Sequence, residues 1–252
     1  MIVLLPLLLG VANASAAGDY GVPALAAASR PLAANSYSAR AADLTSVFVG
    51  DGPLVVRSPD GRSQVRVELV EPDAVVNLIK VTGALGDFTF EIVNGPNAEL
   101  LWAPDSQAFF VTENDGGIVG SYLVYVVARF DGRPQARNLT KLVSDAYGQP
   151  GRCFDPEGPN VAGISWLGSS HRLLIAAQTL SHSNCDGMGT FVAFVIDPWA
   201  MSVGQRYNQL QAKARFGRDL GLALKASDDD CIRQPAACFI PQLHRRDRQD
   251  SR

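Results

Sequence analysis

Apolar and polar residues alternate with a period of two along much of the chain between residues 44 and 198. In residues 64–70, apolar side chains alternate with Arg66 and Glu68, which is the pattern of a strand buried on one face. Runs with strand character recur between turn signals at 44–49, 54–57, 64–70, 74–81, 88–93, 99–102, 108–112, 122–130 and 138–143. The pattern therefore predicts a succession of short strands and few helices.

Three stretches of this pattern superimpose without a gap, which indicates an internal repeat. They are RSPDGRSQVRVEL at 57–69, WAPDSQAFFVTEN at 102–114 and WLGSSHRLLIAAQ at 166–178. In each, an apolar strand ends, a short turn follows and a second strand begins. Pro59 and Pro104 preset the backbone of the turn, and the next residue, Asp60 or Asp105, can accept a hydrogen bond from the backbone beyond it. We expect Trp102 and Trp166, at the end of the first strand, to pack over the turn.

The repeat extends to four strands per copy. Residues 121–141 supply a third strand, an Asp-Gly turn and a fourth strand, and residues 190–198 supply the third strand of the last copy. The copies start 45 residues apart (57 to 102) and then 64 residues apart (102 to 166), and the longer step contains the Gly- and Pro-rich insertion 144–160. This spacing predicts an all-β fold, a β-propeller-like array of about three four-stranded blades.

The end of the repeat region is ambiguous. Residues 201–216 have helical spacing, whereas residues 219–226 alternate leucine with other residues as a strand would. We interpret this region as a short C-terminal helix followed by a strand.

The blade signatures resemble those of the TolB-type β-propeller repeat, which also occurs in the propeller of prolyl-oligopeptidase-like peptidases. The resemblance covers about residues 52–198, and the copy that contains Trp102 matches best. It implies blade architecture and says little about function, because the peptidases carry their catalytic groups in a separate α/β-hydrolase domain that no stretch of this chain could hold. Closed propellers need at least about four blades. Either a degenerate blade forms from the N-terminal strand and residues 218–240, or the array is incomplete and open.

The N-terminal residues are typical of an exported protein. Residues 1–11 are largely apolar, and Ala14-Ser15-Ala16 is a small-x-small site that signal peptidase accepts. We predict a signal peptide over 1–16, an Ala/Ser-rich leader segment over 17–43, one domain over 44–240 and a polar tail over 241–252. Because the first basic residue is Arg30, a buried strand or helix at the N-terminus is the alternative. The apolar stretch is too short for a transmembrane anchor. The expected location is periplasmic or extracellular.

Export changes how the four cysteines are interpreted, because an oxidising compartment favours disulfides over free thiols. Cys153 and Cys185 bracket one irregular stretch, and Cys231 and Cys238 bracket another. We favour these two pairs among the three possible pairings, although the sequence does not fix the connectivity.

Charge and motifs point to no particular chemistry. A formal net charge of −3 offers no field for nucleic acid. The Gly-x-Ser-x-Gly signature of a serine hydrolase does not occur, and His171, His182 and Cys185 lack further evident ligands for zinc. We therefore expect no cofactor and no metal.

The best candidates for binding are aromatic and histidine side chains expected in loops. They are Tyr147, Phe154, His182 and Trp199, and their alternative role is local packing. We expect the binding face to carry residues 144–160 and 180–189. The favoured hypothesis is a non-enzymatic module that binds a protein or a cell-envelope component, with oligomers if the propeller is incomplete. The alternative is a hydrolase or lyase that acts on a polysaccharide or peptide through carboxylates or histidines gathered from several loops.

Overall fold

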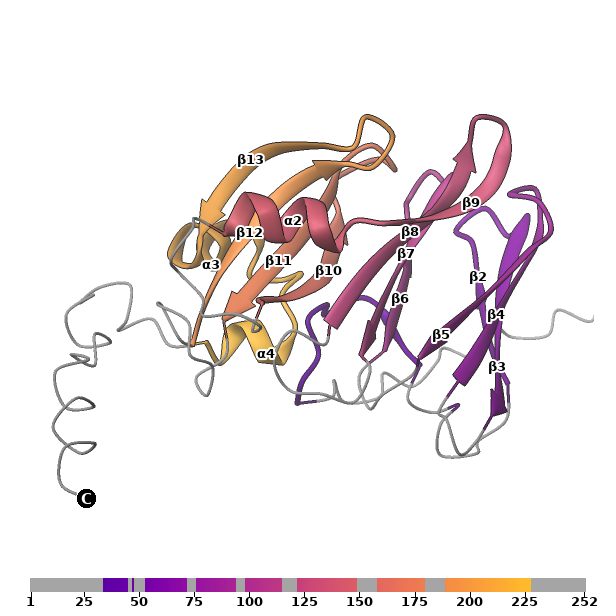
Figure 1. Ribbon diagram of the computed structural model, residues 1–252, viewed down its shortest axis with the longest axis horizontal. Helices are drawn as coiled ribbons and strands as arrows, with labels where there is room; N and C mark the ends of the chain where they lie inside the picture. Colours follow the sequence, from indigo (N-terminus) through magenta and orange to yellow (C-terminus); the bar gives the residue numbers. More distant parts are fainter. Residues whose placement is uncertain are drawn as a thin grey trace, which may run out of the picture. The chain divides into compact units, whose positions relative to one another are not determined.

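The computed structural model contains three antiparallel sheets that follow one another along the chain (Figure 1). It describes residues 34–44, 47, 53–71, 76–93, 98–114, 122–148, 158–179 and 189–227, all within one compact unit, Leu32–Arg252. The first sheet consists of β2 (Leu54–Arg57), β3 (Ser63–Glu71), β4 (Val76–Gly83) and β5 (Phe88–Val93). The second consists of β1 (Ala42–Asp43), β6 (Glu99–Trp102), β7 (Ala108–Asn114), β8 (Tyr122–Phe130) and β9 (Arg133–Asn138). The third consists of β10 (Asn160–Trp166), β11 (Leu173–Thr179), β12 (Thr190–Asp197) and β13 (Ser202–Asn208).

Each sheet is a blade in which four consecutive strands pair in chain order, so the predicted all-β array of three blades is confirmed. In the part of the chain that the structure describes, three short helices accompany the sheets: α2 (Thr140–Tyr147), α3 (Gln209–Phe216) and α4 (Leu222–Lys225). The described strands form no closed barrel, and the array is open.

The turns after β2 and β6 have the expected chemistry. The carboxylate of Asp60 accepts the backbone N–H of Arg62 at 3.0 Å, and that of Asp105 accepts the N–H of Gln107 at 3.1 Å. The next residue has a positive φ in both turns, +69° at Gly61 and +59° at Ser106. The two turns therefore have the same local geometry, as the superimposed sequences predict.

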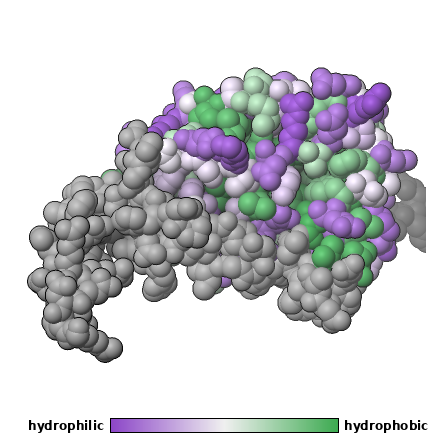
Figure 2. Space-filling view, viewed as in Figure 1, coloured by the Kyte–Doolittle hydropathy of each residue, from purple (hydrophilic) through white to green (hydrophobic). Residues whose placement is uncertain are grey.

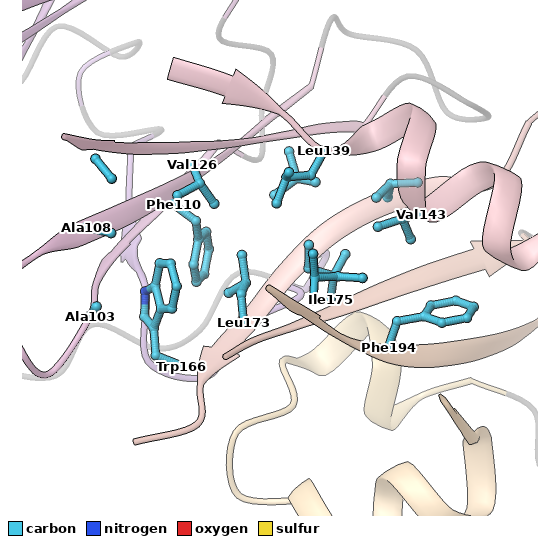
Figure 3. Close-up of a cluster of buried hydrophobic side chains, with 14 of the residues drawn as sticks. Ala103, Ala108, Phe110, Val126, Leu139, Val143, Trp166, Leu173, Ile175 and Phe194 are labelled. Atoms are coloured by element: carbon cyan, nitrogen blue, oxygen red, sulfur yellow. The ribbon is translucent and has the colours of Figure 1, made fainter. Parts of the chain in front are cut away.

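The second sheet is apolar on both faces and is covered on both. Phe109, Val111 and Val127 pack with side chains of the first sheet, including Val65 and Ile79. The residues of alternate parity point the other way, because successive side chains on a strand face opposite sides. Figure 3 shows Phe110 and Val126 facing Trp166, Leu173 and Ile175 of the third sheet, and the cluster is closed by Leu139, just before α2, and Val143, on α2.

Tryptophan side chains join neighbouring blades by hydrogen bonds at equivalent positions. The indole N–H of Trp102 donates to the carbonyl of Val56 in the first sheet at 3.2 Å. The indole N–H of Trp166 donates to the carbonyl of Leu101 in the second sheet at 3.0 Å. Both acceptors lie one residue before the end of the first strand of the preceding blade. The same type of hydrogen bond, here called the joint, therefore connects both pairs of neighbouring blades.

The turns themselves add a second contact to each joint. The backbone N–H of Asp60 donates to the hydroxyl of Ser106 at 3.1 Å, and the N–H of Ser170 donates to the carboxylate of Asp105 at 2.8 Å. In the sequence superposition, Ser106 and Ser170 occupy the same position. The repeat motif therefore stabilises the contact between blades as well as the turn within each blade.

The outer face of the first sheet is exposed and carries charged side chains among apolar ones such as Val55 and Val70. Arg66 and Lys80 both form ion pairs with Glu68 there, and Arg57 occupies the position of the two joint tryptophans. Exposed charged residues on an outer face are typical of the terminal repeats of stacked arrays.

The outer face of the third sheet is covered by helices instead. Phe216, Leu220 and Leu224 pack on it together with Tyr37 from the N-terminal side. An isolated bridge pairs Ser38 with Leu220, and β1 pairs with β6. Residues 36–43 thus belong to the folded part, which begins before the predicted boundary at Leu44.

Three predicted elements are wrong. The strand expected at 138–143 ends at Asn138, whose side chain accepts the N–H of Thr140 at 2.8 Å, and α2 follows because Val143 and Tyr147 are buried at helical spacing. The helix expected at 201–216 begins only at Gln209, after β13. Residues 222–225 are helical rather than a strand, so the part of the degenerate fourth blade that can be assessed is not built of strands.

The misassigned strand has a clear physical origin. Leu220 and Leu224 are buried four residues apart, while Leu222 between them is 40% exposed. Leucine at every second position is compatible with a strand and with a short helix. Only the surface against which the leucines pack decides between the two structures.

The joints between blades lead to a stability prediction. Trp102→Phe and Trp166→Phe keep an aromatic ring but remove the indole donor of a partly buried hydrogen bond between blades. We expect each to lower the free energy of unfolding by about 1–2 kcal/mol in urea denaturation. Arg57→Ala, at the equivalent position of the first blade, should change it by less than about 0.5 kcal/mol. An equal loss of unfolding free energy in all three variants would contradict a stabilising role of the tryptophan hydrogen bonds.

Candidate functional site

The two ends of the array differ in the length of their connections. At one end, here called the turn end, the strands are joined by residues 58–62, 84–87, 103–107, 131–132, 167–172 and 198–201. At the opposite end, the loop end, the longest connections are 115–121, 148–159 and 180–189. These three belong to the second and third blades and contain Phe154, His182, Cys153 and Cys185, all of which lie outside the described residues.

Buried polar side chains gather where the strands reach the loop end. They lie at the last residues of outgoing strands and at the first residues of returning ones: Glu99, Glu113, Asn114, Asn160, Gln178, Thr179 and Thr190. Burying polar groups is costly unless they are hydrogen-bonded, so such a layer needs partners. We call these residues the polar layer.

An N-terminal strap, residues 36–43, supplies many of those partners. The phenol of Tyr37 is 2% exposed and donates to the side-chain oxygen of Gln178 at 2.7 Å, while the amide of Asn160 donates to the phenol at 3.4 Å. Burial raises the pKa of Tyr37, so the phenol keeps its proton and acts as a donor. The strap therefore fixes the inner strands of the third blade to each other.

Glu99 is the central titratable group of the polar layer. It is 5% exposed, and its carboxyl accepts the backbone N–H of Tyr37 at 3.0 Å and that of Ser38 at 3.2 Å. Burial raises the pKa of Glu99 to about 8, against the lowering effect of the two N–H donors, and the neighbouring Asp43 raises it further. Asp43 lies directly opposite Glu99 in the pairing of β1 with β6, so two carboxyl groups share one face of the sheet.

The C-terminal helices are tied to the same layer. The side-chain amide of Gln178 donates to the hydroxyl of Ser227 at 3.0 Å, and Lys213 donates to the backbone carbonyl of Ser227 at 2.7 Å. Gln209 accepts the N–H of Phe191, the second residue of β12, at 3.1 Å. The strap, the third blade and the helices thus form one hydrogen-bonded unit at the loop end.

Tyr147 is a packing residue and not the exposed loop side chain that we expected. It is the last residue of α2, is 2% exposed and shares a hydrogen bond of 2.5 Å with the hydroxyl of Thr179. The insertion was expected to be irregular from residue 144, but its first turn continues a helix. Tyr147 therefore packs in the hydrophobic cluster between the second and third sheets, near the loop end.

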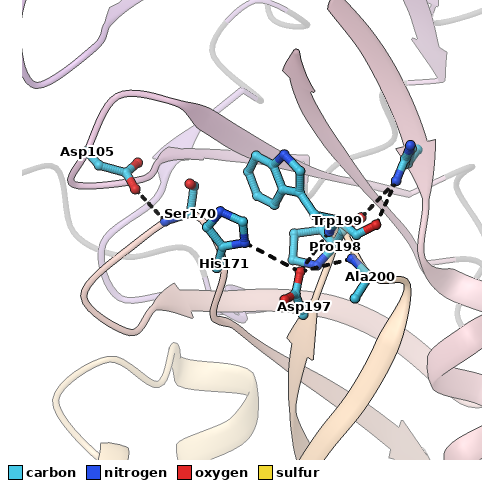
Figure 4. A network of polar contacts seen from close by, with 8 residues as sticks. Asp105, Ser170, His171, Asp197, Pro198, Trp199 and Ala200 are labelled. Carbon is cyan, nitrogen blue, oxygen red and sulfur yellow. Dashed lines mark hydrogen bonds and ion pairs between the residues drawn. The ribbon is translucent and has the colours of Figure 1, made fainter. Parts of the chain in front are cut away.

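Trp199 lies at the turn end, in the connection between β12 and β13 (Figure 4). One face of its ring stacks on His171 with centroids 4.4 Å apart, and Phe130 lies 5.3 Å from it in a tilted arrangement. Arg137 donates to the carbonyls of Pro198 and Trp199, both at 3.2 Å. Trp199 is thus held between blades as a packing residue, with only part of its surface exposed.

Four residues were expected to share one binding face, and two of them do not. Tyr147 bonds to Thr179 at the loop end, whereas Trp199 lies at the turn end of the same blade. Phe154 and His182 belong to the loop-end connections, so their assignment to that face stays a prediction. The disulfide pairs, the signal peptide and the polar tail also fall outside the described residues and stay predictions.

The described residues contain no group of three or more His, Cys, Asp or Glu side chains able to hold a metal ion. His171 is 58% exposed and lies 3.7 Å from Asp197, whose carboxylate already accepts two backbone N–H groups of its own turn. These are the hydrogen bonds that an aspartate commonly accepts from the backbone of its own turn.

Sequence reasoning missed Glu99, Tyr37 and Ser38. Glu99 carries a weak signal, because it begins an apolar strand just before the repeat motif. Tyr37 and Ser38 lie in an Ala/Ser-rich segment with no periodic pattern, and nothing in the sequence marks them as partners of a residue 62 positions away.

A scan of the chain against protein-family models gave no match, and searches of curated proteins and of solved structures gave none. Among the described helices, none is long and apolar enough to cross a membrane.

The role of Tyr147 can be tested by removing its hydroxyl. Tyr147→Phe leaves Thr179 without this partner in a buried position, and we expect the free energy of unfolding to fall by about 1 kcal/mol. Tyr125→Phe, which removes a phenol only partly buried beside Glu113, is the matched control and should cost less. Unchanged stability of Tyr147→Phe would contradict the packing role.

Proposed function

We propose that this chain is an exported, periplasmic or extracellular binding module with no enzymatic activity, built from TolB-type β-propeller repeats. It recognises a protein or a cell-envelope component through the loop end of the array. The observation that carries this proposal is that the three longest connections of the second and third blades leave from one end. Recognition residues concentrate on such connections when a rigid scaffold holds them.

The opposite end is a poorer candidate. Its turns are short, and the groups at the joints bond to one another: Asp60 to Ser106, Asp105 to Ser170, and Arg137 to the connection that holds Trp199. On the face seen in Figure 2, hydrophilic and apolar side chains are interspersed over the described elements. A partner that docks at the loop end leaves these joints intact.

The proposed disulfide between Cys153 and Cys185 fits this end of the third blade. Asn160 and Gln178 are paired across β10 and β11, so the connection that holds Cys153 ends next to the start of the connection that holds Cys185. A covalent link between the two would pre-organise both connections and reduce the entropy lost on binding. Phe154 and His182, in the same connections, are the proposed contact residues.

Affinity capture with the mature chain from native envelope or culture fluid tests the proposal. We expect Phe154→Ala and His182→Ala to reduce the amount of a specific partner at least tenfold, since aromatic anchors dominate interfaces. Trp199→Ala, at the turn end, is the matched control and should retain the partner, provided that circular dichroism shows an intact fold. Loss of the partner in Trp199→Ala alone would place the binding face at the turn end and contradict the proposal.

The alternative is a hydrolase or lyase that acts on a polysaccharide or peptide, and one observation favours it. Asp43 and Glu99 place two carboxyl groups side by side, one with a raised pKa, as general acid–base catalysis requires. Glu99, however, is buried and occupied by two backbone donors of the strap. Hydrolysis of glycan or peptide substrates by the native chain, abolished in Glu99→Gln, would support the enzyme over the binding module.

A further inference from the structure

The N-terminal strap connects parts of the fold that are distant in sequence. Its residues Ala42 and Asp43 add a fifth strand to the inner edge of the second sheet, by pairing with Leu100 and Glu99. Tyr37, a few residues earlier, packs on the outer face of the third sheet. The strap thus bridges two blades, and Glu99 accepts its backbone N–H groups where it passes from one blade to the other.

The strap also holds the last helix. The hydroxyl of Ser36 accepts the N–H of Leu222 at 3.1 Å, and the carbonyl of Ser36 accepts the N–H of Ala223 at 3.0 Å. These are the first residues of α4, whose N–H groups have no partner within the helix. The carbonyl of Tyr37 accepts the N–H of Gly221 at 2.8 Å, and a Cβ at Gly221 would lie 2.1 Å from the carbonyl oxygen of Ser36. The strap and α4 therefore dock as one unit.

Among the described residues around Glu99, the titratable groups supply little positive charge. Asp43 on β1 adds a like charge, and Tyr37 on the strap is kept neutral by burial. Thr112, the residue opposite Glu99 on β7, is uncharged. Arg40, the one cation in the described part of the strap, forms an ion pair with Asp219 at 3.3 Å. Ionised Glu99 would be a buried carboxylate beside a second carboxylate.

Opposing effects act on the protonation of Glu99. Its Oε1 lies 3.0 Å from the amide nitrogen of Tyr37, and the amide nitrogen of Ser38 lies 3.2 Å from Oε2 and 3.4 Å from Oε1. These donors favour the ionised form, but burial of the carboxyl, with Asp43 beside it, outweighs them. Ionisation keeps both hydrogen bonds but places a negative charge where water cannot reach it, a cost that release of the strap removes.

We propose that the strap and α4 form a pH-sensitive latch, docked on the second and third blades while Glu99 is protonated and loosened when Glu99 ionises. This device is independent of which partner the loop end recognises. The conformation of the strap would then depend on the pH around the protein, because it responds to the ionisation of the Glu99 carboxyl in the polar layer.

The direction in which docking of the strap changes with pH follows from proton binding. With the strap docked, burial holds the pKa of Glu99 near 8, and with the strap released the carboxyl meets water and returns to about 4.3. Between these values the docked state binds a proton that the released state lacks, so docking weakens as pH rises. Below about pH 4 the latch is fully closed, and the opening equilibrium constant grows by up to tenfold per pH unit towards pH 8.

Amide hydrogen exchange of the whole chain between pH 5 and pH 8 tests the latch. After correction for the intrinsic exchange rate, we expect protection of residues 36–43 and of α4 to fall together, by up to tenfold per pH unit, and to stay below that of the core strand β11 at every pH, because the strap opens without global unfolding. Glu99→Gln should remove this dependence. Glu91→Gln, at an exposed position of β5, is the matched control and should retain it.

Two further measurements keep the test independent of one variant. Asp43→Asn removes the neighbouring charge, so protection should stop falling at a lower pH than in the native chain. In the native chain, carbon-13 NMR of the Glu99 carboxyl should show a midpoint well above 4.3. Protection that is flat with pH, a slope that persists in Glu99→Gln, protection of residues 36–43 equal to that of β11, or an ordinary midpoint would each overturn the latch.

Discussion

The middle sheet of this protein is apolar on both faces, and neither face can remain in water. Phe109 and Val111 require the first blade, and Phe110 and Val126 require the third. Every other feature follows from this need. The tryptophan joints set the register between neighbouring blades, Gly163 lets Phe110 approach the backbone of β10, and the end blades must then cover or polarise their own outer faces.

The outer faces of the first and third blades differ in how they meet solvent. The first blade presents Arg66, Glu68 and Lys80 to solvent, and it has Arg57 in place of the tryptophan that would reach a preceding blade. The third blade keeps an apolar outer face and covers it with Tyr37, Phe216 and Leu224. The two end blades thus differ: charged side chains lie exposed on one outer face, and the strap and helices cover the other.

How much of this was predictable depends on how local each signal is. Most strands of the three blades, the turns at Asp60 and Asp105 and the equivalence of Trp102 with Trp166 follow from short patterns, and the structure confirms them, whereas β13 was predicted to be part of a helix. The helices α2 and α4 were not predicted, because Val143 and Leu224 are helical only with respect to the surface that buries them. The pairing of Glu99 with the strap joins residues 62 positions apart, and no local pattern encodes it. The loop-end residues Phe154 and His182 remain predictions.

The central claim is that one indole-to-carbonyl joint repeats between successive blades. The chain has three tryptophans, and the indole hydrogens of Trp102 and Trp166 are bonded to the preceding blade, whereas that of Trp199 has no bonded partner among the described residues. Hydrogen exchange of the three indole signals in nitrogen-15 NMR measures this directly. The account predicts two indole hydrogens that exchange only with opening of the joints and one that exchanges quickly. Rapid exchange of all three would contradict it.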